Sequence, residues 1–232
     1  VFGVGFLWSL FTGAMRGRLA LQILAIGALG GLQGAIGWIM VASGLEGDMT
    51  AVAPVKLMLH LTTASAIYTL LTMQATSLGS PHGERAPLPI KRFATVLLLG
   101  SLVAVSKAGF TWNTWPLIDG HLVPSKEMLF SASPLIENFV DNTALVQFNH
   151  RMSAYLLLAV ALFHGWQTAR TMPQTRARRR AISITYLVSL QAVIGIATLL
   201  YAVPLWLGLL HQAFAFVVLG MVATHRAALS RG

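Results

Sequence analysis

Cysteine is absent from this chain of 232 residues, and acidic residues are scarce, with only seven Asp and Glu in total. The absence of cysteine excludes disulfides, thiolate catalysis and cofactors attached through cysteine, and it leaves the redox compartment undetermined. Charged residues of both signs make up 10% of the chain, against about 25% in soluble domains. Hydrophobic residues make up 56%, and the mean hydropathy is +0.70. This composition is typical of a membrane protein.

Long apolar runs recur along the chain, and each is long enough to cross a hydrocarbon core of roughly 30 Å. We expect six full membrane spans, near residues 19–43, 55–79, 93–112, 144–168, 181–203 and 205–226. The apolar stretch 1–14 is too short to cross, so we interpret it as the end of a further helix and the sequence as N-terminally incomplete. It has neither a charged n-region nor a cleavage site of small residues, so we do not interpret it as a signal peptide.

The net charge of +9 is distributed unevenly between the two sides of the predicted spans. Taken alternately, the connections on one side carry most of the Lys and Arg residues, and those on the other carry nearly all Asp and Glu residues. The positive-inside rule places the basic connections and the C-terminus on the cytoplasmic side of a bacterial inner membrane, or on the matrix side of a mitochondrial one. We call this the inner side and the opposite, periplasmic or intermembrane side the outer side. We expect membrane lipids, and no nucleic acid, as partners of the basic residues.

A weak internal repeat connects the two ends of the chain. The segment LQGAIGWIMV (Leu32–Val41) aligns with LQAVIGIATL (Leu190–Leu199), and the two share Leu-Gln and Ile-Gly. Each copy ends one span and leads through an outer connection to a span with a histidine near its start, His60 and His211 respectively. This common position predicts duplication of a four-helix unit.

The expected fold is an all-α, polytopic membrane helical bundle with two pseudo-symmetric four-helix halves, of which the first helix and part of the second are missing here. Residues 1–79 would form the remainder of the N-terminal half, 80–92 an inner-side linker, and 93–232 the C-terminal half. That half includes a long outer loop, 113–143, in which Ser133-Pro134 predicts the start of a short helix.

Three of the seven histidines share one geometry. His60, His150 and His211 each lie about five to seven residues inside the outer end of a span that runs inward, so a rise of 1.5 Å per residue puts them at nearly the same depth. Ionisable side chains inside a span are costly and face the bundle interior. A single one could be a core histidine, but three in one layer without an intramembrane carboxylate favour metal ligation.

The other four histidines have simpler interpretations. We expect His82, His121 and His225 in loops or at a span end, where water solvates them. We expect His164, in the inner half of its span, to be a hydrogen-bonded or interfacial side chain rather than a ligand.

The residue types favour haem iron over other metal centres. Zinc or di-iron sites usually recruit carboxylates or thiolates, whereas two imidazoles that face each other across a bundle suit six-coordinate haem iron. Alanine follows each candidate ligand by four residues, on the same helix face, and leaves room for a porphyrin plane; these residues are Ala64, Ala154 and Ala215.

Two basic residues near the histidine layer are candidates for binding haem propionates. Arg151 follows His150, and Lys107 lies near the outer end of its span. Cations in these positions could pair with propionates that point outward. The alternative, which stays open, is that both side chains reach to phosphate headgroups.

Several motifs together resemble the heme A synthase family, over nearly the whole chain. The similarity is greatest to the cysteine-free branch found in alphaproteobacteria and mitochondria. The motifs are VQFNHRM (146–152), SPLIENFVDN (133–142), KAGFTWNTWPLIDGHLVP (107–124), LQGAIGWIMVASGL (32–45), the histidine of KLMLHL (56–61) and LLHQ (209–212).

The resemblance implies eight transmembrane helices and two histidine pairs. His150 and His211 would hold a b-type haem in the C-terminal half, and His60 would be one ligand at the site of the haem O substrate. The partner of His60 and a catalytic acid belong, in the family, to a Glu-x-x-His-Arg segment expected just before Val1, so no catalytic residue is assigned here. The reaction implied is oxidation of the C8 methyl group of haem O to the formyl group of haem A, which terminal oxidases use. Heme O synthase as the source of haem O and an electron donor are the implied partners, and homo-oligomerisation stays open.

Two other functions compete with this one. A membrane b-type cytochrome would use the same histidine pairs for electron transfer without modifying its haem. A transporter with a histidine proton relay would have broken helices or acids at mid-depth, and the sequence indicates neither.

Overall fold

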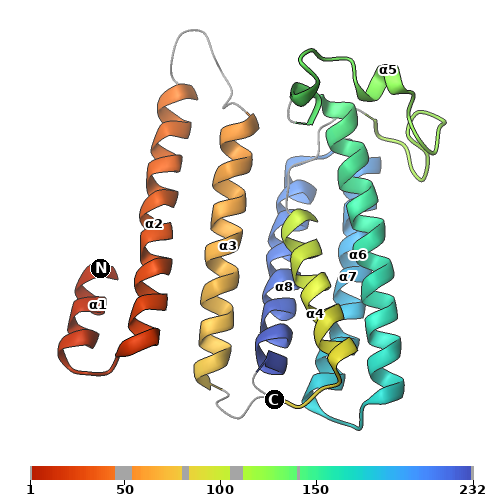
Figure 1. Cartoon of the computed structure of the whole chain (residues 1–232). Helices are drawn as coiled ribbons and strands as arrows, with labels where there is room; N and C mark the ends of the chain where they lie inside the picture. The colour runs from red at the N-terminus through yellow and green to blue at the C-terminus, as the bar shows by residue number, and fades with distance from the viewer. Residues whose placement is uncertain (1, 45–53, 80–83, 105–111, 140–141, 231–232) are drawn as a thin grey trace. The chain divides into compact units, whose positions relative to one another are not determined.

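The structure is a computed structural model that describes residues 2–44, 54–79, 84–104, 112–139 and 142–230. Within these ranges every regular element is a helix, and the isolated bridge between Ile118 and His121 belongs to no strand. The elements, drawn in Figure 1, are α1 (Phe2–Phe11), α2 (Gly17–Gly44), α3 (Pro54–Gly79), α4 (Leu88–Ala104), α5 (Lys126–Leu129), the 3-10 helix η1 (Leu135–Phe139), α6 (Thr143–Thr171), α7 (Arg176–Leu200) and α8 (Leu205–Ser230).

The six predicted spans correspond to the six long helices α2, α3, α4, α6, α7 and α8. Three of these are long and apolar enough to cross a membrane among the described residues: Gly17–Ala42, Arg176–Leu200 and Leu205–Leu229. α6 is not among these three, and it contains the polar residues Gln147, His150, Arg151 and His164. The prediction of a polytopic membrane helical bundle is confirmed. The end of the third span was placed at residue 112, and residues 105–111 lie outside the described part of the chain.

The chain divides into two compact units, Val1–Leu71 and Thr72–Gly232. In the first unit α1 packs on α2, where a side chain at Gly27 would collide with the ring of Phe2. The division falls inside α3, whereas the sequence predicts a linker over 80–92, which follows α3 and includes the first turn of α4. The predicted boundaries of the two halves therefore stay a prediction.

In the second unit four long helices surround one apolar core. α6 packs on both α4 and α7, and α8 packs on the same two helices, so α6 and α8 occupy diagonal positions (Figure 1). Side chains on α6 and α8 that point inward therefore meet in the centre of the unit. The core residues are Leu97, Leu98, Leu157, Ala161, Ile184, Val188, Val218, Leu219, Val222 and Ala223.

Short turns keep neighbouring helices antiparallel in this unit. α6 ends before Pro173, which cannot continue a helix, and α7 begins after Thr175, whose hydroxyl accepts a hydrogen bond from the N–H of Arg178. Only residues 201–204 connect α7 to α8. Consequently the last turns of α7 lie beside the first turns of α8.

The segment between α4 and α6 is tied to the start of α6 by Asn142, the helix N-cap. Its Oδ1 accepts hydrogen bonds from the N–H groups of Ala144 and Leu145, at 2.9 and 3.2 Å. Its Nδ2 donates within this segment to the acceptors Met128 O, Leu129 O, Ser131 Oγ and Asn138 Oδ1. The short helix predicted after Ser133-Pro134 is present as η1, which starts at Leu135.

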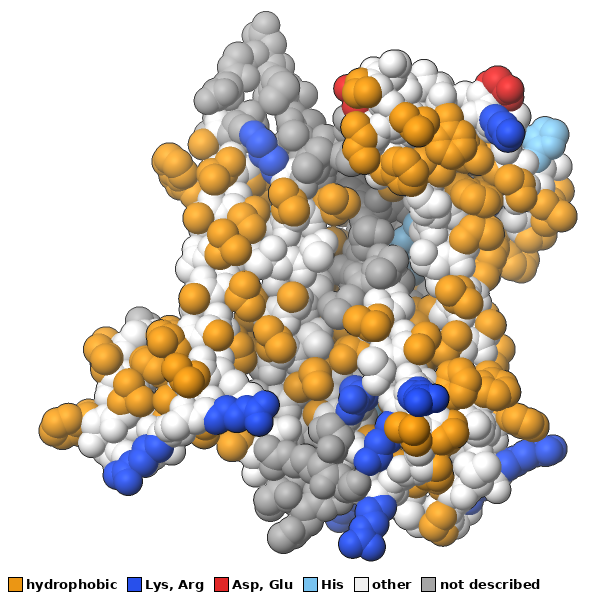
Figure 2. Space-filling model, viewed as in Figure 1, with side chains coloured by type: hydrophobic (Ala, Val, Ile, Leu, Met, Phe, Trp, Pro, Cys, Tyr) orange, Lys and Arg blue, Asp and Glu red, His pale blue; other side chains and the backbone are white. Residues whose placement is uncertain are grey.

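Charge separates the two ends of the second unit. Figure 2 shows Lys and Arg side chains around the end where α4 and α7 begin, and acidic side chains on the segment at the opposite end. At the basic end Arg180 forms an ion pair with Glu84 at 2.7 Å, and Arg226 donates to the hydroxyl of Thr95 at 2.7 Å. The charge asymmetry expected from the sequence is thus present in this unit.

Replacement of Asn142 by alanine should destabilise the second unit. Loss of an N-cap costs about 0.5–2 kcal/mol, and the acceptors in the loop lose their donor. We expect a lower unfolding temperature in detergent and faster proteolysis of residues 112–139. Asn142→Asp, which keeps the capping oxygen but not the Nδ2 donor, should restore only part of the stability. Asn113→Ala, at an exposed position, serves as the control, and equal behaviour of the two alanine variants would contradict the anchoring role.

Candidate functional site

His150 and His211 face each other across the interior of the second unit. His150 is the eighth residue of α6 and His211 the seventh of α8, and the diagonal position of these helices brings the imidazole rings together. The ring centroids are 6.3 Å apart and the ring planes form an angle of 67°. Two metal–nitrogen bonds of about 2 Å each put the two coordinating nitrogens up to about 4 Å apart. Each nitrogen lies at the edge of its ring, so the ring centroids are farther apart than the nitrogens. The spacing of this pair therefore fits one metal ion between the rings.

Gln191 of α7 holds the imidazole ring of His211. Its Nε2 lies 3.0 Å from the backbone carbonyl oxygen of His211 and 3.1 Å from the ring Nδ1. Both groups accept hydrogen bonds from the amide, so the ring is fixed relative to its own backbone. The same amide nitrogen is 3.5 Å from the ring Nε2, so the amide lies closer to Nδ1 than to Nε2. A metal would bind at Nε2 once the ring proton has moved from Nε2 to Nδ1.

His60 in the first unit has the same arrangement. It is the seventh residue of α3, and the Nε2 of Gln33, on α2, lies 3.0 Å from its carbonyl oxygen and 3.1 Å from its Nδ1. The distances match those between Gln191 and His211. The two units therefore present a histidine in the same way.

Glycine in each repeat makes room for the ring. A Cβ at Gly195 would come within 2.8 Å of Cε1 of His211, and one at Gly37 would come within 3.0 Å of Cε1 of His60. Both glycines follow the glutamine by four residues and lie on the same helix face. The sequence repeat already aligned these residues, but the sequence alone gave no reason to connect Gln33 and Gln191 with the histidines.

The three alanines one turn after the histidines are partly buried: Ala64, Ala154 and Ala215. A side chain of this size takes up little room on the helix face that also carries the histidine. Contact between these alanines and a porphyrin stays a prediction.

Arg151 is buried under residues 112–117, in the segment between α4 and α6, rather than exposed at the protein surface. It is 6% exposed, and its terminal nitrogens donate to the carbonyl oxygens of Leu117 and Trp112, at 3.3 and 3.0 Å. Gln147 donates to the same Trp112 carbonyl at 3.1 Å. A salt bridge from Arg151 to a propionate stays a prediction, and Lys107 lies outside the described residues.

A second histidine pair lies deeper in the same two helices. His164 and His225 are both 0% exposed, and their Nε2 atoms are 2.9 Å apart, with ring centroids at 5.1 Å. The prediction that His164 is hydrogen-bonded is confirmed. The expectation that water solvates His225 is wrong: it lies inside α8, and its ring bonds to His164 in the interior. His121 is exposed as expected, and His82 lies outside the described residues.

The two histidine pairs differ in what they can bind. His164 and His225 are hydrogen-bonded directly, so no metal ion lies between their nitrogens, whereas the His150–His211 spacing fits one. Among the described residues no group of three or more His, Cys, Asp or Glu could hold a metal. The His150–His211 spacing is compatible with a centre that has two axial imidazoles, and metal binding by this pair stays a prediction.

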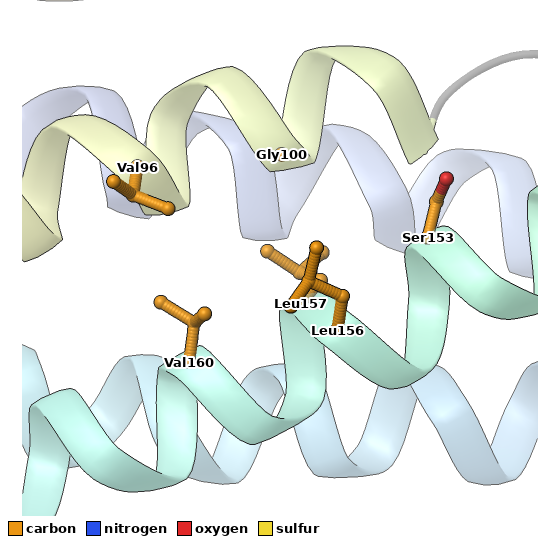
Figure 3. Close-up of a pocket in the computed structure, with 6 residues that line it drawn as sticks. All are labelled: Val96, Gly100, Ser153, Leu156, Leu157 and Val160. Atoms are coloured by element: carbon orange, nitrogen blue, oxygen red, sulfur yellow. The ribbon is translucent and has the colours of Figure 1, made fainter.

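An apolar pocket of about 150 Å³ lies between α4 and α6, one turn inward from His150. Figure 3 shows the side chains that line it, which come from the facing sides of these two helices: Val96, Gly100, Ser153, Leu156, Leu157 and Val160. Ser153 provides its one polar side chain. This lining suits an apolar group and offers no acid or base for chemistry.

Comparisons with known proteins give one consistent family. Residues 1–223 match the family model COX15-CtaA, described as cytochrome oxidase assembly protein. The chain is 54% identical to a protein named heme A synthase from Methylobacterium nodulans, over 97% of the chain and 65% of that protein. It is 46% identical to a heme A synthase from Brucella suis, over 96% of the chain and 63% of that protein. The chain thus spans a little under two thirds of the length of these curated relatives. No solved structure matches it.

The hydrogen bond between His164 and His225 should stabilise the second unit. Replacing either residue by leucine leaves a buried imidazole without its partner, at a cost of about 1–3 kcal/mol. The double variant should cost less than the sum of the two single variants, because no orphaned ring remains. Thermal unfolding in detergent measures all three, with His121→Leu as the control at an exposed position. Strictly additive effects would contradict a direct bond.

Proposed function

The chain belongs to the COX15-CtaA family of cytochrome oxidase assembly proteins, and we propose that it is an integral membrane oxidoreductase that converts haem O to haem A. The relatives named heme A synthase, up to 54% identical, support this assignment. The single observation that carries it is the 54% identity to a protein named heme A synthase. The 6.3 Å spacing of His150 and His211 inside an apolar helical bundle supports a haem site. Family membership confirms the resemblance inferred from the motifs.

The C-terminal half is proposed to hold a b-type haem. His150 and His211 would be its axial ligands, with Ala154 and Ala215 beside the porphyrin plane. Arg151 and Lys107 are the proposed partners of the propionates. Burial among apolar side chains excludes water, which is one of the means by which a protein sets haem reactivity.

The N-terminal half is proposed to hold the haem O substrate, with His60 as one ligand and Ala64 beside the porphyrin. Its contact with Gln33, which matches that of His211 with Gln191, supports iron ligation by a histidine in both halves. The second ligand and the catalytic acid stay unassigned in this sequence. When bound, haem supplies the redox chemistry, while the residues of this chain bind the iron, orient the rings and exclude water.

Oxidation of a methyl group to a formyl group needs redox partners. We propose that heme O synthase supplies haem O, and that an electron donor in the same membrane serves the b-type haem. The basic end of the second unit would face the cytoplasm or the matrix and contact anionic lipids, with the histidine layer toward the periplasmic or intermembrane side. A homo-oligomer is compatible with this proposal.

Pigment extraction tests the proposed activity against the alternative of a b-type cytochrome without haem modification. The full-length protein, expressed with a source of haem O, should yield haem A in the extract. Only haem B or haem O in a redox-active protein would favour the cytochrome. Purified protein without a Soret band would contradict both.

Variants of the two histidine pairs test the axial ligands. We expect His150→Ala and His211→Ala each to abolish the low-spin signal of the C-terminal haem, because one axial bond is lost. His164→Ala should keep this signal, since its ring bonds to His225 instead. Optical and electron paramagnetic resonance spectra of the purified full-length protein measure it, with His121→Ala as the control. A normal bis-histidine spectrum in both His150→Ala and His211→Ala would refute the assignment.

A further inference from the structure

We propose that Gln191 and Gln33 are positioning residues that hold His211 and His60 in the orientation required for axial ligation, and that supply the acceptor for the ring N–H of the bound state. This inference rests on the proposed function. It concerns two side chains that belong to neither the metal ligands nor the residues proposed to contact haem.

The first support is the repetition of one contact in two separate units. In each unit a glutamine on one helix reaches the next long helix, where its amide nitrogen donates to both the carbonyl oxygen and the Nδ1 of a single histidine. The four distances are 3.0 and 3.1 Å in both cases. A chance contact in an apolar bundle would not be expected twice with the same atoms.

The second support is the glycine one turn after each glutamine. Gly37 and Gly195 let the Cε1 edge of the ring approach the helix backbone, where any larger residue would push the ring away. The ring is therefore confined by the amide on one side and by the helix surface on the other. The repeated Leu-Gln-x-x-Ile-Gly sequence thus provides the binding surface for a histidine ring of the following long helix.

The third support comes from the hydrogen bonds that the glutamine amide can donate and accept. An amide nitrogen can only donate, so a hydrogen bond from it to Nδ1 requires the tautomer in which the neutral ring carries its proton on Nε2. A metal at Nε2 requires that the proton be on Nδ1, which must then donate. The Oε1 atoms of Gln33 and Gln191 are buried and have no hydrogen-bond partner among the described residues. If the amide keeps its hydrogen bond to the backbone carbonyl oxygen of the histidine and rotates about it, Oε1 can reach Nδ1–H. The same amide can thus pair with the metal-free ring, as a donor, and with the metal-bound ring, as an acceptor.

Only an amide has this combination of groups. Leucine at either position would fill the space but offer neither donor nor acceptor. Glutamate would offer a stronger acceptor to Nδ1–H but no donor to the carbonyl oxygen. Because a stronger acceptor makes the imidazole a more basic ligand and favours ferric iron, the two substitutions should shift the reduction potential of the haem in opposite directions.

The experiment is a potentiometric titration of the b-type haem in the purified full-length protein. We expect Gln191→Glu to lower the potential and Gln191→Leu to raise it. Each change would correspond to about a tenfold shift in the ratio of ferric to ferrous affinity, or 59 mV for one electron. Gln191→Leu should also retain haem about 10–100-fold less tightly. If Gln191→Leu holds no haem, a lowered reduction potential in Gln191→Glu supports the inference, and an unchanged or raised potential contradicts it. Gln167→Leu, at a partly buried position in the inner half of α6, is the matched control.

Gln33 in the N-terminal half allows an independent test. Gln33→Leu should weaken binding of added haem O about 10–100-fold, and leave the potential of the C-terminal haem unchanged. Potentials in both Gln191 variants equal to that of Gln167→Leu, or shifted in the same direction, would overturn the inference. Such a result in a protein that still makes haem A would leave the proposed function intact, whereas a wild-type protein that makes no haem A would contradict the proposed function alone.

Discussion

The contact between a glutamine amide and a histidine is the interaction on which the candidate site depends. Inside an apolar bundle a polar side chain has no water to satisfy it, so each imidazole needs a partner from the protein. Gln191 provides that partner for His211, and Gln33 provides it for His60. The amide binds the ring and the carbonyl of the same residue, which leaves the ring little freedom to rotate. An axial ligand must have this property, because a metal bond requires the nitrogen to point in one direction.

The two histidine pairs of the second unit show that helix packing sets the distance between facing rings. That distance decides whether a metal ion fits between two rings or whether they hydrogen-bond to each other. His150 and His164 lie on α6, His211 and His225 lie on α8, and within each helix the two are 14 residues apart. This separation is about 21 Å along a helix axis, so both layers lie across the same diagonal of the second unit. In the outer layer the rings are separated by the width of a metal centre. In the inner layer, beyond the core cluster around Ala161 and Val222, the rings bond to each other.

Much of this arrangement follows from the sequence. Runs of apolar residues predict the six long helices, since only a helix satisfies its own backbone in a membrane. The positions of His60, His150 and His211 near the starts of their helices follow from the same runs, and the repeat around Gln33 and Gln191 indicates two related halves. Other features depend on contacts between distant segments. His225 stands near the end of an apolar run, so its burial against His164 could not be predicted without the positions of α6 and α8.

The sequence by itself determined the helical class of the protein, the order of its histidines along each helix and its family, because hydropathy, spacing and motifs are properties of single segments. The tertiary structure alone decided that His164 pairs with His225 and how each histidine ring is held. Those outcomes depend on the diagonal placement of α6 and α8 and on the close approach that Gly195 permits to His211. Arg151 illustrates the same dependence on contacts between distant segments. Its position next to His150 in the sequence predicted a cation near a haem edge. Its burial, however, depends on hydrogen bonds to the carbonyl oxygens of Trp112 and Leu117, more than 30 residues away in the sequence.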